Sequence, residues 1–207
     1  GGFTPDAYPY ASVFTRESVR LEQQKRLDEG VARVEKEIAQ SSAKMQTRSF
    51  TPEVKDGITA QMDAKLKAIN TMRSTEATGR ITLGLNRNLT QPQSLPNLVL
   101  KDGDSFFIPS TISEVHVMGE VFNQQSTIWK PDSTILEKMA SAGGPTRHAD
   151  MKQLFVIRAD GTVVSYGQQG KRFIQLPMYP GDTLVVPEEL DFATWKYELK
   201  ERLGTRG

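Results

Sequence analysis

Apolar residues alternate with mostly polar ones from Val115 to Val121, with Gly119 at one of the apolar positions. Alternation with a period of two predicts a strand that buries one face. Residues 126–129 are rich in β-branched and aromatic side chains and predict a second strand, antiparallel to the first. Residues 130–132 should end this pairing, because the proline at their centre has no N–H to donate to a neighbouring strand.

A short helix and a third strand are predicted next. Thr134 and Glu137 have the spacing of a capping box. The apolar face of this helix would consist of Ile135, Leu136, Met139 and Ala140. The Gly-Gly-Pro at 143–145 should end the helix, residues 154–157 predict a strand, and Asp160-Gly161 predicts a hairpin turn. We therefore predict an α+β fold in which one helix lies across a mixed sheet.

The chain also contains an internal repeat. Residues 1–17 align with residues 143–159, beginning with Gly-Gly in both. Further matched pairs are Thr4 and Thr146, Ala7 and Ala149, and Arg16 and Arg158. Residues 102–109 align with residues 180–187, since both contain a glycine turn, an aspartate, an apolar run and a final proline. The interval between the two segments is much longer in the first copy, which predicts an insertion there.

The insertion is predicted to be an antiparallel pair of helices. Residues 17–45 carry apolar side chains at helical spacing, namely Leu27, Val31, Val34, Ile38 and Met45. Ser41-Ser42 and the polar residues that follow suggest the turn. Thr51 as N-cap and Pro52 in the first turn begin a second helix, and Gly79 should end it. Its apolar stripe would consist of Val54, Ile58, Met62, Leu66 and Ile69.

The order of these motifs resembles a known domain family. The motifs are V-x-V-x-G-E-V from Val115, P-D-S-T-I-L-E from Pro131, A-G-G-P-T-x-x-A-D from Ala142, F-V-I-R-A-D-G-T from Phe155 and P-G-D-T-L-V-V-P from Pro180. In order and spacing they resemble the soluble-ligand-binding β-grasp (SLBB) domains of outer-membrane polysaccharide export (OPX) proteins, in particular the longer members with several SLBB domains. The resemblance covers residues 113–190.

The resemblance, the repeat and the helical pattern together divide the chain into four parts. Residues 1–14 and 79–112 form a partial SLBB (β-grasp) domain, within which residues 80–85 predict a strand and residues 86–97 a loop. Residues 15–78 are the inserted helical hairpin, and residues 113–190 are a complete SLBB domain. The four parts end with a C-terminal tail, 191–207, predicted to form a short helix. That helix either packs its aromatic residues on the domain or approaches a membrane, as the C-terminal helix of OPX relatives does.

The resemblance also implies a function. OPX relatives stack SLBB domains in rings around a lumen, carry capsular polysaccharide or exopolysaccharide across the outer membrane, and meet an inner-membrane polysaccharide co-polymerase. The expected location is the periplasm, in association with the outer membrane. Two alternatives remain open: a monomeric module that binds a small soluble ligand or a glycan in a pocket lined by Trp129 or Tyr166, and an interaction scaffold in which the helical hairpin recruits a partner.

Composition narrows these possibilities. With 26 basic and 25 acidic residues among 207, the formal net charge is +1, so no overall charge favours nucleic acid or an anionic membrane surface. The absence of cysteine excludes disulfides, zinc–thiolate sites and thiol catalysis. No apolar run approaches the length of a membrane span. The chain opens Gly-Gly-Phe without a start methionine, and we interpret it as a segment whose targeting sequence would lie upstream.

Few residues suggest chemistry. No catalytic triad, phosphate loop or metal-ligand spacing is present, so we expect neither an enzyme nor a cofactor or metal site. His116 is interpreted as a polar-face strand residue, and the Gly-x-x-Gly at 167–170 as a loop. The candidate contacts for a glycan or a neighbouring subunit are Arg147, His148, Asp150 and Lys152, in the loop after the predicted helix, together with Trp129. The alternative for that loop is simple exposure to solvent.

Overall fold

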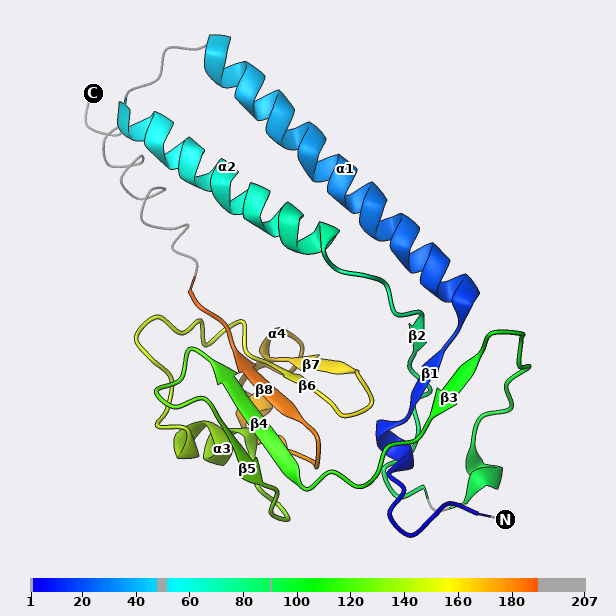
Figure 1. Ribbon diagram of the computed structural model, residues 1–207. Coiled ribbons are helices and arrows are strands. Elements are labelled where there is room, and N and C mark those ends of the chain that lie inside the picture. The colour runs from blue at the N-terminus through cyan, green and yellow to red at the C-terminus, as the bar shows by residue number, and fades with distance from the viewer. Residues whose placement is uncertain (1, 48–51, 90, 190–207) are drawn as a thin grey trace. The chain divides into compact units, whose positions relative to one another are not determined.

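The computed structural model describes residues 2–47, 52–89 and 91–189 (Figure 1). The chain forms two compact units. The described residues of the first, the sheet unit, come from Gly1–Phe14, Thr82–Leu100 and Ser105–Asp191. Those of the second, the hairpin unit, come from Thr15–Ile81 and Lys101–Asp104. The arrangement of helices and mixed sheets confirms the predicted α+β class.

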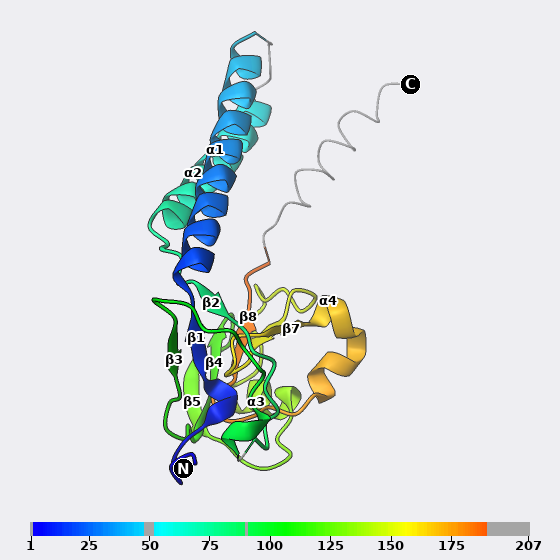
Figure 2. The ribbon, with the colours of Figure 1, turned by 90° about the vertical axis from the view of Figure 1, so that its right-hand side faces the viewer.

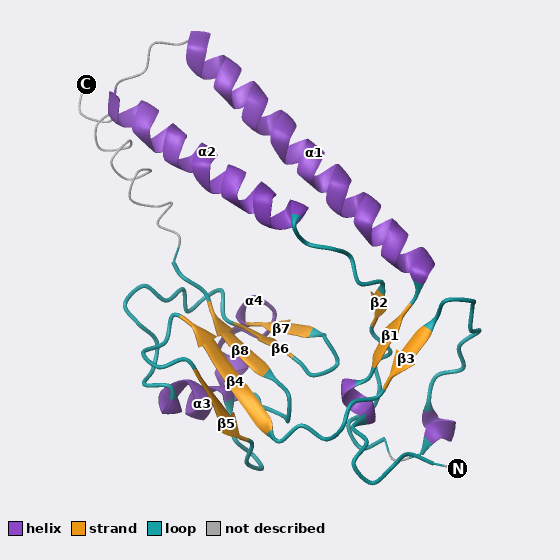
Figure 3. Ribbon diagram, in the orientation of Figure 1, coloured by secondary structure: helices purple, strands orange, loops and turns teal. Residues whose placement is uncertain are grey.

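A five-stranded mixed sheet forms the centre of the sheet unit (Figure 3). Its strands are β4 (Glu114–Gly119), β5 (Gln125–Ile128), β6 (Phe155–Ile157), β7 (Val163–Ser165) and β8 (Thr183–Val186), in the order β5-β4-β8-β6-β7. The β4–β8 pair is parallel and the other pairs are antiparallel. The predicted alternation in β4 is confirmed, because Val115 and Val117 are buried and Met118 is exposed.

Helix α3 (Ile135–Ser141) packs on this sheet. Its capping box is confirmed: the Glu137 N–H donates to Thr134 Oγ1, and the Thr134 N–H donates to a Glu137 carboxylate oxygen. The predicted apolar face was partly wrong, since Leu136 and Ala140 are exposed. The core instead contains Ile135, Met139 and Ala142 from this segment. A two-turn helix can direct only a narrow stripe at the sheet.

Residues 167–170, interpreted from sequence as a loop, belong to helical structure. Helix α4 (Tyr166–Gln169) continues into the 3-10 helix η3 (Gly170–Gln175). A second capping box, between Ser165 and Gln168, starts α4. In the following η3, Phe173 is fully buried in the core. The Gly-x-x-Gly spacing hid this capping box, because glycine is a poor helix former.

The hairpin unit contains two long helices, α1 (Glu17–Thr47) and α2 (Pro52–Arg73), which lie side by side and antiparallel in Figures 1 and 2. Val31 and Ile69 are buried between them, whereas Leu66 is 45% exposed despite its place in the predicted stripe. The side chains of Met45, Val54 and Ile58 lie outside the described residues, as does the predicted N-cap Thr51.

Two predicted boundaries of the helical hairpin were wrong. Helix α1 continues through Ser41-Ser42 to Thr47, because serine is tolerated inside a helix that already has a packing partner. Helix α2 ends at Arg73, well before Gly79. Gly79 has another role: its φ is 69° and an added Cβ would lie 2.6 Å from the Arg16 carbonyl oxygen. Only glycine fits at this position, where the chain that follows α2 passes close to the backbone at the start of α1.

The remaining strands form a three-stranded sheet in the order β2-β1-β3. They are β1 (Val13–Thr15), β2 (Arg80–Ile81) and β3 (Ser105–Phe107). Two 3-10 helices belong to the same repeat: η1 (Pro9–Ala11) precedes β1, and η2 (Pro92–Ser94) lies between β2 and β3 in the chain. The strand predicted over residues 80–85 is shorter than expected. Leu85 is nevertheless buried, which explains its apolar character without a strand.

The two sheets contain the same substructure. Strands β1 and β3 correspond to β6 and β8 under the alignment of the two sequence repeats, and β2 pairs with β1 where β7 pairs with β6. The Tyr8 N–H donates to the Pro109 carbonyl at 2.8 Å, and at the aligned positions the Asp150 N–H donates to the Pro187 carbonyl at 2.8 Å. The isolated bridges Ala7 to Ser110 and Ala149 to Glu188 are likewise aligned. Equivalent backbone pairing at aligned residues shows that the repeat is structural as well as sequential.

The copies differ at one turn and at one edge. In the second copy Gly161, at φ 87°, closes a tight turn between β6 and β7 by donating its N–H to the Arg158 carbonyl. In the first copy the two long helices replace that turn. Within the described residues β3 pairs with β1 alone, whereas β8 lies between β4 and β6. For this reason Phe106 is 40% exposed and its counterpart Leu184 is fully buried.

An ion pair is also duplicated. Arg16 Nε and Nη2 donate to the two carboxylate oxygens of Asp104 at 2.9 and 2.8 Å. At the aligned positions, Arg158 Nη1 donates to Asp182. The Lys101 N–H also donates to Asp104, and these hydrogen bonds, led by that of Arg16, lower the pKa of Asp104 to about 2. The glycine turns alone do not account for these aspartates, because each aspartate also accepts hydrogen bonds from an arginine of another segment.

We expect the hairpin unit to lose stability as the pH falls from about 3.8 to about 2, the interval between the ordinary and the folded pKa of Asp104. The carboxylate favours folding only while it is ionised, so its contribution is complete above this interval and lost below it. Urea unfolding followed by far-ultraviolet circular dichroism at several pH values measures the change. Asp104→Asn should flatten the decline, and the exposed Asp102→Asn should retain it. An equal decline in both variants would contradict the assignment to Asp104.

Candidate functional site

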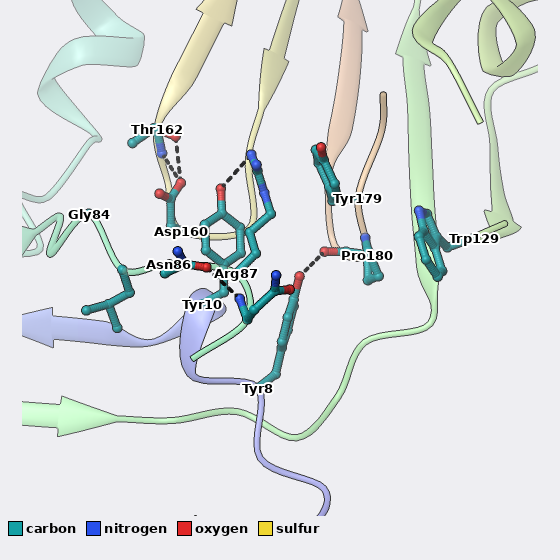
Figure 4. Close-up of a pocket in the computed structure, with 12 residues that line it drawn as sticks. Tyr8, Tyr10, Gly84, Asn86, Arg87, Trp129, Asp160, Thr162, Tyr179 and Pro180 are labelled. Carbon is teal, nitrogen blue, oxygen red and sulfur yellow. Dashed lines mark hydrogen bonds between the residues drawn. The ribbon is translucent and has the colours of Figure 1, made fainter. Parts of the chain in front are cut away.

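An open cleft of about 740 Å³ lies within the sheet unit (Figure 4). Its lining comes from both repeats. The first repeat contributes Tyr8, Tyr10 and residues 84–88. The second contributes Asp160 and Thr162 from the β6–β7 turn, Tyr179 and Pro180 from the turn before β8, and Trp129 after β5. Turns of two repeats therefore form one concave surface.

A guanidinium lies between two aromatic rings in this cleft. Arg87 Cζ is 3.8 Å from the centroid of the Tyr179 ring and 4.9 Å from that of Tyr10. One Arg87 N–H also donates to the Tyr10 hydroxyl at 3.3 Å, as Figure 4 shows. Cation–π attraction of this kind holds a long side chain in one place without neutralising its charge.

The hydroxyls of Tyr8 and Tyr10 are protonated at neutral pH. Burial raises the pKa of Tyr8 to about 12, with a further contribution from the charge of Asp182. Burial also raises the pKa of Tyr10. The Tyr8 hydroxyl donates to the Pro180 carbonyl at 3.0 Å. The two phenols therefore act as hydrogen-bonding groups and not as bases in this pH range.

Asp160 and Trp129 are each held by a neighbouring group. Asp160 Oδ1 accepts hydrogen bonds from the N–H and the hydroxyl of Thr162, at 2.8 and 2.6 Å. Trp129 Nε1 donates to the Met178 carbonyl at 2.7 Å. The cleft thus combines fixed aromatic faces with a few polar groups, a composition that suits a ligand with both C–H faces and hydroxyls.

The structure separates the residues proposed from sequence. Trp129 lines the cleft, whereas the other four lie in the loop after α3 and do not line it. There, Arg147 Nε donates to His148 Nε2 at 3.0 Å, and the Lys152 N–H donates to Asp150 Oδ1 at 2.9 Å. Those two contacts are local to the loop. Their role in binding a glycan or a subunit stays a prediction.

Tyr166, the second aromatic residue considered for a pocket, packs edge-on against Phe173 at the core, with centroids 6.3 Å apart. Sequence reasoning missed Arg87, Tyr10 and Tyr179. They come from distant segments and carry no common motif, so only the fold brings them together. Asp160 was noticed, but only as part of a hairpin turn.

No group of three or more histidine, aspartate or glutamate side chains among residues 2–47, 52–89 and 91–189 could hold a metal ion. No helix in the described part of the chain has both the length and the apolar character needed to cross a membrane.

The fold and the cleft define an α+β protein with a duplicated three-stranded unit and an aromatic cleft. No family model matches the chain. Two proteins of Escherichia coli, each named polysialic acid transport protein KpsD, are 25% identical to it over 176 residues. The aligned region is 82% of this chain and 29% of each relative, so the chain spans less than a third of their length. The chain is thus distantly related to a polysaccharide transport protein.

Proposed function

We propose that this chain is a segment of a polysaccharide export protein and that its repeated units are SLBB domains. The observation that carries the proposal is the similarity to the two KpsD proteins, which extends over 82% of the chain. A second support is the structural repeat itself, with its aligned ion pairs Arg16–Asp104 and Arg158–Asp182. Multi-domain OPX proteins, which the motifs resemble, are built from such repeats.

In this proposal the full-length protein lies in the periplasm in association with the outer membrane. It self-associates in a ring around a lumen, carries capsular polysaccharide or exopolysaccharide, and meets an inner-membrane polysaccharide co-polymerase. It is not an enzyme and needs no cofactor. A conduit guides a long polymer by many weak contacts, because binding has to be weak enough for the polymer to leave. An open cleft with aromatic and polar lining is suited to contacts of this strength.

Deletion of the gene tests export. The expected result is loss of polysaccharide from the cell surface and accumulation of polymer inside the cell, both restored by the intact gene. Extraction and immunochemical quantification of the two pools measure the effect. Normal surface polysaccharide in the deletion strain would contradict the proposal. Loss of both pools would also contradict it, because it would indicate a defect in synthesis.

The second candidate is a monomeric module that binds a small glycan, and the cleft is the observation that favours it. The two candidates predict different assemblies. Native mass spectrometry of the full-length protein should show a closed oligomer if the protein forms an export conduit. A monomer that binds a short glycan would favour the second candidate.

A further inference from the structure

We propose that the cleft of the sheet unit is a binding site for an acidic sugar, with Arg87 contacting the carboxylate of that sugar. The inference rests on the proposed handling of polysaccharide and adds a chemical class for its ligand. It is carried by the state of Arg87: an exposed, positioned cation at the edge of an aromatic cleft.

The charge of Arg87 is not balanced by an ion pair in the part of the chain that the structure describes. The other arginine near this cleft, Arg158, is buried and paired with Asp182. The acidic residue of the lining, Asp160, is 8% exposed, and one of its carboxylate oxygens accepts two hydrogen bonds from Thr162. Arg87 itself is exposed. A ligand entering the cleft therefore meets an accessible positive charge.

The geometry of Arg87 leaves its donors free for a ligand. A guanidinium has five N–H donors arranged around its edge, and the Cζ of Arg87 lies over the rings of Tyr10 and Tyr179. Its hydrogen bond in the cleft, to the Tyr10 hydroxyl, is long at 3.3 Å. A planar guanidinium matches the two oxygens of a carboxylate, and a side chain already held by stacking loses less conformational entropy on binding.

The rest of the lining suits the remainder of a sugar. Trp129 presents an aromatic face whose orientation is fixed by its hydrogen bond to Met178. The exposed Asn86 and Asn88 lie beside Arg87 in the same segment. Side-chain amides both donate and accept hydrogen bonds, as sugar hydroxyls require. A carboxylated sugar would thus find an anion site, an apolar face and hydroxyl partners within one cleft.

The competing explanation is that Arg87 only anchors residues 84–88 on the second repeat. Both explanations predict that loss of Arg87 disturbs the cleft. They differ in the charge of the ligand: an anchoring arginine gives equal affinity for an acidic sugar and for its neutral ester, whereas a carboxylate site does not.

The test is a titration of this chain with a sialic acid tetramer and, separately, with the fully methyl-esterified tetramer, which has the same rings without the charge. Nuclear magnetic resonance reports amide shifts and the arginine Nε–H signals. We expect the Arg87 and Trp129 side-chain signals to shift with the acid, and affinity for the ester to be lower by roughly tenfold or more. The preference should weaken at high salt.

Two variants complete the experiment. Arg87→Met keeps an unbranched, apolar stem and removes the charge, so it should bind the acid as weakly as the wild type binds the ester. Arg172→Met, an exposed position in η3, is the matched control and should bind like wild type. The comparison of acid with ester in the wild type needs no variant, so misfolding of Arg87→Met would not leave the inference untested.

Three outcomes would overturn the inference. Equal affinity for acid and ester would show a site without charge selectivity, and the export proposal would stand. Acid binding with shifts confined to Arg147 and His148 would place the anion site in the loop after α3. Binding of neither ligand would remove the cleft as a sugar site, while the gene deletion would still decide on export.

Discussion

Replacing Gly119 with alanine should destabilise the sheet unit by about 3–5 kcal/mol, because two costs act at one residue. Gly119 has a φ of 95°, a backbone conformation that residues with a side chain rarely adopt. It also ends β4 opposite Val186 in the parallel pair with β8. An added Cβ would lie 2.1 Å from the Val186 carbonyl oxygen, which accepts the Glu120 N–H at 2.7 Å, and residues 183–185 of the same strand pair with β6 on the other side. Neither strand can move without losing sheet hydrogen bonds.

Gly144→Ala is the matched control for this substitution. Gly144 has a φ of 82°, but nothing lies within 4 Å of its added Cβ. Only the conformational cost remains, so we expect a loss of about 1–2 kcal/mol. Urea unfolding followed by Trp129 fluorescence in a Trp195→Phe background measures both. Equal losses in the two variants would show that the close approach at Val186 has no energetic consequence.

Arg158→Met should cost about 3–5 kcal/mol at neutral pH, because it leaves the buried carboxylate of Asp182 without its cation. The Asp182 side chain is fully buried, and its remaining donors are the N–H groups of Tyr179 and Ala159, at 2.8 and 3.3 Å. The variant also loses the hydrogen bond from Arg158 to the Pro177 carbonyl. The equivalent change Arg16→Met should cost less, since that pair is more exposed.

The pH dependence of this loss identifies its cause. Burial already raises the pKa of Asp182, and Arg158 opposes the shift. Without Arg158 the folded pKa rises further above the unfolded one, so protonation on lowering the pH should favour the folded state. The deficit of Arg158→Met should therefore shrink toward pH 4. A deficit that is constant with pH would point to lost packing, and Arg172→Met should show almost no deficit.

The buried pair also supports the cleft. Asp182 accepts the N–H of Tyr179, and Arg158 Cζ lies 5.4 Å from the centroid of the Tyr179 ring, which Arg87 also contacts. Both ion pairs thus stabilise the fold of their repeat, and the Arg158–Asp182 pair also supports Tyr179, which lines the candidate binding cleft. Loss of Arg158 should consequently broaden or shift the Arg87 side-chain resonance, even where the fold is retained.

Much of the architecture followed from local patterns. The alternation in β4, the capping box of α3 and the repeated glycine–aspartate turns each reflect a backbone preference that acts over a few residues. The long helices were predicted for the same reason. Their ends were not, because packing between α1 and α2 carries the first helix past Ser41-Ser42. The helical turn at 166–169 was missed, since its capping box outweighs the low helix propensity of Gly167.

The candidate site was much harder to predict. Trp129 was proposed as an aromatic residue that could line a pocket, and the residues from Arg147 to Lys152 because they lie together in the loop after the predicted helix. Arg87 lies in residues 86–97, for which the sequence predicts only a polar loop. Its position depends on Tyr10 and Tyr179, which are far away in the chain and carry no shared spacing. The unbalanced charge of Arg87 is likewise a property of its neighbours and not of its sequence.

The sequence by itself determined that this protein has an α+β fold, a repeated unit and a pair of long helices within the first copy, because these depend on residue periods and turn preferences that act locally. The tertiary structure alone decided that Arg16 and Arg158 form ion pairs with aspartates and that Arg87 is exposed to solvent. It also decided where the turns of the two repeats meet to form a cleft. Those features arise from contacts between distant segments, whose burial and charge no local pattern encodes.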